Sequence, residues 1–167
     1  MRPLRRAVSC VTTRILNVRG GYHPSEKPHS AIIGDGLPVE LGGLGQLSLR
    51  MVHHYRVLED PHERGPWKVS TAAYYYSLDD ADGQEIISYH WHPRSRSPIR
   101  FPHLHVGPAA GCAREELAAA HCPTSRISLE EFLRFVITDF RVEPLRSDWS
   151  HVFEEAQQNF QSWRTWP

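Results

Sequence analysis

Two histidine pairs of the form His-x-His lie close together in the middle of the chain. They are His90/His92 and His103/His105, and both belong to the stretch from 84 to 106. Each pair lies in a run of strand-forming residues, and alternate residues of a strand point to opposite faces of a sheet. If the two strands are neighbours, the four imidazoles share one face. This pattern constrains the fold strongly, because it requires a sheet with one polar and one apolar face.

The residues that alternate with these histidines are apolar or aromatic: Ile87, Tyr89, Trp91, Leu104 and Val106. Because the side-chain period of a strand is two, we predict that this second face is buried beneath helices. The histidine face is then open to solvent or to a ligand. The same alternation places Glu85 on the face of Tyr89.

Strands and hairpins dominate the region before the histidine pairs. Regular structure is predicted to begin at Leu47, with strands over 47–58 and 68–78. An Asp-rich turn that ends at Gly83 then joins the second strand to the strand over 84–92, because glycine adopts the positive φ of such a turn at low cost. Alternation in the middle strand predicts two sets, one of Val69, Thr71, Ala73 and Tyr75 and the other of Tyr74, Tyr76 and Leu78.

Helical signals appear only after the second histidine pair. A short helix is predicted over 113–120, and Ser128 with Glu131 matches a capping box. Apolar residues at helical spacing follow the box: Leu129, Phe132, Leu133, Val136, Ile137 and Phe140. A last helix is predicted over 148–163. Strands first and helices last predict an α+β fold: a small antiparallel sheet of four to five strands with C-terminal helices packed on one face.

The first part of the chain reads differently from the rest. Residues 1–46 are rich in glycine and proline, apart from a strand-like run over 11–18, and we predict a loop-rich and partly disordered segment there. Residues 47–167 are predicted to form a single α+β domain. A chain of 167 residues is long enough to bury one core of this size.

Charge and cysteine usage exclude several classes of protein. Lys+Arg and Asp+Glu are equal at 19 each, so the whole chain has no strong electrostatic field. The three cysteines form no CxxC pair, which argues against a disulfide framework or a zinc ribbon. No apolar run approaches the roughly 20 residues of a membrane span. We therefore expect a cytoplasmic protein that does not interact with membranes.

Several motifs together resemble a known family. They are a Tyr-rich strand, an acidic glycine turn, the sequence PHLHV and a helix that begins SLEEFL. This combination, over about 55–140, is similar to TumE-type toxins, which are small bacterial ribonucleases of toxin–antitoxin pairs. The resemblance implies RNA cleavage and a cognate antitoxin as partner, and only His103 and His105 carry over from its pattern. The segment before 47 and the Trp-rich tail have no counterpart in it.

The histidines and arginines also suit RNA cleavage on chemical grounds. Histidine titrates near neutral pH, so His103 and His105 can act as general base and general acid. Arg96 and Arg100 can stabilise the charge that develops on the phosphate. Arg94, together with the pair His90 and His92, is then expected to bind the substrate.

Metal binding is the competing interpretation of the same residues. Neutral imidazoles bind zinc, nickel, copper and iron, so His90, His92, His103 and His105 are candidate ligands of a divalent transition metal. The nearby arginines oppose a cation, so the leading interpretation has no cofactor. The alternative function is that of a non-enzymatic binding protein, either through such a metal site or as a protein-interaction module.

Overall fold

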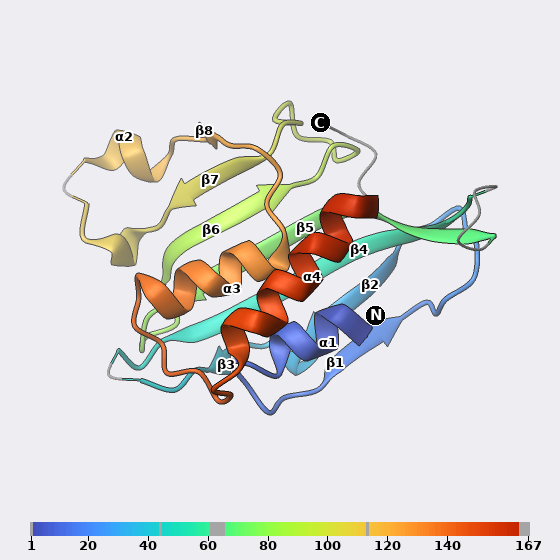
Figure 1. The fold of residues 1–167 in the computed structure, drawn as a ribbon. Coiled ribbons are helices and arrows are strands. Elements are labelled where there is room, and N and C mark those ends of the chain that lie inside the picture. Colours follow the sequence, from blue (N-terminus) through green and yellow to red (C-terminus); the bar gives the residue numbers. More distant parts are fainter. Residues whose placement is uncertain (1, 44, 61–65, 113, 164–167) are drawn as a thin grey trace.

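One antiparallel sheet runs through most of the chain, with helices on one of its faces (Figure 1). The computed structural model describes residues 2–43, 45–60, 66–112 and 114–163. The strands in chain order are β1 Leu16–Arg19, β2 His29–Ile33, β3 Val39–Glu40, β4 Ser48–Glu59, β5 Trp67–Asp79, β6 Glu85–Trp91, β7 His103–Val106 and β8 Cys122–Pro123. They are arranged in the order β1-β2-β4-β5-β6-β7-β8, and β3 pairs with β4. The predicted mixture of an antiparallel sheet and C-terminal helices is confirmed, but the predicted strand number was wrong, because the sheet has eight strands.

The N-terminal part of the chain belongs to this sheet. The predicted loop-rich segment contains α1 Arg2–Val8 and the strands β1, β2 and β3. β2 pairs with β4 across the predicted boundary, and Val8, Cys10 and Ile33 belong to the hydrophobic core. The segment therefore contributes a helix and three strands to the fold, which the sequence prediction did not include. These strands are short and surrounded by glycines, and they are stabilised by pairing with a strand distant in sequence rather than by local periodicity.

The C-terminal helices follow the predicted pattern closely. They are α3 Leu129–Thr138 and α4 Trp149–Trp163, whereas α2 Glu115–Ala118 is shorter than predicted, and position 113 lies outside the described residues. The predicted capping box is confirmed: the Ser128 hydroxyl accepts a hydrogen bond from the Glu131 amide at 3.1 Å, and the Glu131 carboxylate accepts one from the Ser128 amide at 2.6 Å. Two 3₁₀ turns, Gly34–Gly36 and Pro108–Ala110, complete the described elements.

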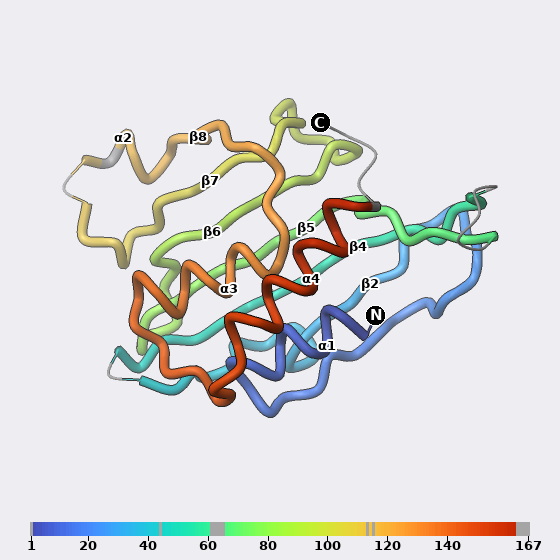
Figure 2. Tube along the Cα trace, viewed as in Figure 1, coloured from blue at the N-terminus to red at the C-terminus, as the bar shows by residue number. Residues whose placement is uncertain are grey.

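Helices α1, α3 and α4 cover the same face of the sheet (Figure 2). Phe132 of α3 packs against the rings of Tyr76 and Tyr89, with ring centroids 5.7 and 5.9 Å apart. Trp91 is buried as predicted, whereas the other apolar residues of β6 and β7 named above are only partly buried. The helices lie mainly over the middle of the sheet, so the strands nearer the β8 edge are less covered (Figure 1).

The hairpin between β5 and β6 has the predicted turn. Gly83 has a φ of +75°, in the region that favours glycine. The Asp80 carboxylate accepts hydrogen bonds from the backbone amides of Asp82 and Gln84 at 3.0 and 2.8 Å. The turn is therefore stabilised locally, independently of the core.

A bulge in β5 changes which side chains face the helices. His54 pairs with Ala73 but Tyr55 pairs with Thr71, so one residue of β5 is left over between them. Val69 and Thr71 consequently lie on the helical face, and the Thr71 hydroxyl is 3.3 Å from Nε2 of buried His53. The prediction that Val69 and Thr71 share a face with Tyr75 was wrong, because an added residue inverts the alternation.

None of the helices in the described ranges combines the length and the apolar character that a bilayer crossing needs.

Candidate functional site

The two predicted histidine pairs gather on the sheet face that the helices leave uncovered. In the register of β6 and β7, His90 is opposite His103, and Ser88 is opposite His105. The His90 ring centroid lies 4.7 Å from that of His105 and 5.4 Å from that of His103. His92 follows β6 and lies 5.5 Å from His103. The prediction that both pairs share one face is confirmed.

A fifth histidine joins them, and the sequence prediction missed it. His121 precedes β8, which pairs with β7, and its ring centroid lies 4.5 Å from that of His105 and 5.1 Å from that of His103. We refer to His90, His92, His103, His105 and His121 as the histidine cluster. The pairing of β8 brings in His121, and a strand of two residues has too little alternation to be recognised in a sequence.

His103 lies at the buried centre of the cluster. It is 1% exposed, so the face that was predicted to be open to solvent or to a ligand is not open to solvent at this position. Its Nδ1 lies 2.9 Å from the carbonyl oxygen of Phe101, which can only accept a hydrogen bond. Nδ1 of His103 is therefore the protonated donor in the neutral ring, and Nε2 carries the free lone pair.

His90 is held by two neighbours on the same face. Its Nε2 lies 2.9 Å from the hydroxyl of fully buried Ser88, and its ring packs edge-on against Tyr75 with centroids 4.7 Å apart. When Nε2 donates to Ser88, Nδ1 of His90 is left as the nitrogen with a lone pair. Hydrogen bonds of this kind fix the ring and the tautomer of metal-binding histidines.

The environment of the cluster favours neutral imidazoles. Burial, and after it the charges of the other four histidines, lower the pKa of His90 to about 3. Burial also lowers the pKa of His92 and of His105. The lowered pKa values favour the uncharged form of His90, His92 and His105, which is the form that binds a metal ion. We expected the nearby arginines to oppose a cation at this site. None of them is among the groups that shift the pKa of His90.

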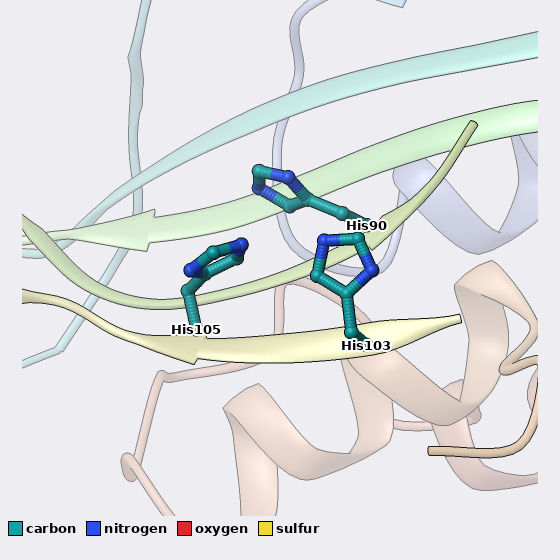
Figure 3. Close-up of side chains that lie close together, drawn as sticks. All are labelled: His90, His103 and His105. Carbon is teal, nitrogen blue, oxygen red and sulfur yellow. The ribbon is translucent and has the colours of Figure 1, made fainter. Parts of the chain in front are cut away.

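Three members of the cluster have the spacing of a metal site. One ligand nitrogen each of His90, His103 and His105 lies within 4.8 Å of the others. Figure 3 shows the three rings facing a common space between β6 and β7. Two nitrogens bound to one zinc at about 2.1 Å each lie at most about 4.2 Å apart, so small ring rotations would bring this set to binding distance. The donor set therefore fits a transition metal.

A carboxylate lies beside the cluster because of a second bulge. Leu78 pairs with Ile87, but Asp79 pairs with Glu85, so β6 has one extra residue at this point. The alternation is inverted, and the Tyr75 hydroxyl donates a hydrogen bond to Glu85 at 3.2 Å. The negative charge of Glu85 acts against the other effects on the pKa of His105 by raising it. The prediction that Glu85 shares the face of Tyr89 was therefore wrong.

A groove of about 640 Å³ begins at the cluster and continues along β4 and β5. Five of its lining side chains are basic or imidazole groups, and none of its described lining residues is acidic: His54, Arg56, His92, Arg94 and Arg126. We refer to it as the basic groove. His92 belongs to both the basic groove and the histidine cluster.

The predicted arginines divide into two groups. Arg94 lines the basic groove, as a substrate-binding role requires. Arg96 and Arg100 are exposed in the segment between β6 and β7, and they do not line this groove. The structure thus brings Arg94, but not Arg96 or Arg100, together with the histidines.

We compared the chain with known protein families, sequences and structures. No family model, no curated protein sequence and no solved structure matches this chain.

Proposed function

We propose that the protein binds one divalent transition metal ion through His90, His103 and His105. The observation that supports this is the convergence of three imidazole nitrogens within 4.8 Å, one of them on a ring that is 1% exposed. One imidazole is buried and the other two are partly buried beside it, and neutral imidazole is the usual nitrogen ligand of zinc, copper and nickel.

The surroundings support a site with an open coordination position. Three protein ligands and a fourth position for water or substrate are typical of catalytic zinc sites. His121 and His92 lie next to the three ligands and can supply a further nitrogen. Glu85 places one negative charge beside His105, which partly offsets the charge of a bound cation.

Zinc titration of the metal-free protein tests this proposal. We expect calorimetry to give one zinc ion per chain, with His90→Gln and His105→Gln each binding zinc more weakly. The loss should exceed the roughly 10–100-fold typical of changes in outer-shell partners, because a ligand itself is removed. His151→Gln, an exposed position of α4, is the matched control and should leave the affinity unchanged. Weak or substoichiometric binding by the folded wild type, or equal affinity in the His105 variant, would contradict a metal site.

The basic groove favours a second candidate function, the cleavage of single-stranded RNA. A phosphate chain lying along Arg56 and Arg94 would pass His92 and reach the histidine cluster. Since His103 is buried, we propose that His105 and the exposed His121 exchange the protons of the reaction. This candidate keeps the resemblance to the TumE-type toxins, which implies a cognate antitoxin as partner.

Cleavage of a mixed single-stranded RNA in the presence of EDTA distinguishes the two functions. Metal-independent cleavage should persist with the chelator, and His105→Ala should slow it by roughly a hundredfold, the usual scale for loss of a general acid or base. Arg94→Ala should weaken RNA binding more than Arg100→Ala does, because only Arg94 lines the basic groove. Absence of cleavage in both metal-loaded and EDTA-treated wild type would remove the ribonuclease and leave the metal-binding protein.

A further inference from the structure

A separate cavity lies between the helices and the sheet, on the face opposite the histidine cluster. It has a volume of about 320 Å³, near the lower end of the range of about 300–1,000 Å³ for small-molecule sites. Its walls are mostly apolar, with Leu4, Leu129 and Ala156 supplied by three different helices. Val69 and Asn159 also line it and are exposed, so they mark its mouth.

The deep end of this cavity contains buried ionisable groups that the histidine cluster does not involve. His53 is 9% exposed, and its two ring nitrogens lie 2.7 Å from the Tyr76 hydroxyl and 3.3 Å from the Thr71 hydroxyl. Glu130, in the first turn of α3, is 5% exposed. Burial lowers the pKa of His53 to about 4 and raises the pKa of Glu130, so both side chains are shifted toward their neutral forms.

A permanent positive charge lies in the wall of the same cavity. Arg126 lines it, and the guanidinium carbon lies 3.6 Å from the centroid of the Trp91 ring. This cation–π interaction fixes the guanidinium group over Trp91, which lines the basic groove, so Arg126 lies between the basic groove and the cavity. Together with the apolar side chains of the lining, the charge makes the cavity mostly apolar and positive at one wall. That pattern complements an anion with an apolar body.

We propose that this cavity binds a small carboxylate with an apolar body, of the medium-chain fatty acid class. The carboxylate is paired with the charge of Arg126, and the chain lies against Leu129 and Ala156. The site does not depend on the proposed metal site, which lies on the other face of the sheet, whereas Arg126 and Thr71 line both this cavity and the basic groove.

Calorimetry with decanoate and decan-1-ol, both below the concentration at which they aggregate, tests the proposal. These probes share the same chain and differ in charge. We expect decanoate to bind one to one and decan-1-ol to bind at least tenfold more weakly. Arg126→Gln should weaken decanoate binding by roughly tenfold or more, as expected for one lost charge-assisted hydrogen bond, and should leave decan-1-ol binding unchanged. Equal affinity for acid and alcohol would overturn the assignment of a carboxylate.

Two filling variants establish that the ligand lies in the cavity. Ala156→Leu adds volume from α4, and Leu4→Trp adds it from α1, which also lines the cavity. Each should abolish binding of both probes while circular dichroism shows a folded chain. If Ala156→Leu fails to fold, Leu4→Trp decides the matter, because Leu4 is only partly buried. Unchanged decanoate binding in the folded variants, or no binding by the wild type at millimolar decanoate, would refute the proposal.

Discussion

Phe132→Ala should lower the free energy of unfolding by about 3–5 kcal/mol, the usual cost of removing a buried phenylalanine ring. Phe132 is 1% exposed and is the α3 side chain that contacts both Tyr76 and Tyr89. Its loss leaves a void between the sheet and the helix, and the rings around it cannot collapse without shifting the backbone. Urea unfolding of wild type and variant measures the difference.

Phe101→Ala is the matched control for this substitution. The same atoms are removed, but Phe101 is 42% exposed, so the change in unfolding free energy should be much smaller. Equal losses for the two variants would show that Phe132 does not hold the helix to the sheet in the way described.

The protein should lose stability as the pH falls from 6.5 toward 4, and His53 should contribute a separable part of that loss. Burial, and to a smaller extent the charge of neighbouring His54, lower the pKa of this imidazole from 6.5 to about 4. The unfolded chain therefore takes up a proton in this range before the folded chain does, so stability that is complete above pH 6.5 is lost as the solution becomes more acidic. The full effect of this one group is about 3 kcal/mol.

The measurement is urea unfolding at several pH values between 7.5 and 4.5, with a chelator present so that metal binding does not contribute. His53→Gln should reduce the dependence by most of the amount expected for this one group, because glutamine does not titrate, and the part due to His90 should remain. His151→Gln, on the exposed side of α4, should leave the profile as it is in the wild type. A wild-type profile that is flat over this range, or one that His53→Gln does not alter, would disprove the assignment.

The parts of the fold that were predictable are those with long local periodicity. The apolar stripe and the capping box of α3 extend over ten residues, and the glycine turn defines its own hairpin. The shared face of the two histidine pairs followed from alternation, given that β6 and β7 are neighbours. Here local preference and tertiary packing agree, which is the condition under which a sequence pattern is informative.

The parts that were not predictable depend on single residues or on distant partners. The extra residues in β5 and β6 invert the alternation of side chains, and nothing in the local sequence indicates where they lie. As a result Thr71 and Glu85 lie on the faces opposite to those predicted. β1 and β2 are only four and five residues long, and β2 forms because β4 is there to pair with it. His121 joined the site through the even shorter β8.

The division of the three proposed ligands between two strands has a mechanical consequence. His90 belongs to β6, whereas His103 and His105 belong to β7, whose other neighbour β8 has only two residues. A bound ion would therefore cross-link β6 and β7 near the edge of the sheet formed by β8, in addition to the backbone hydrogen bonds between the two strands. Local opening of β7 would then require the ion to leave, so the exchange rate of its amide hydrogens reports directly whether the site is filled.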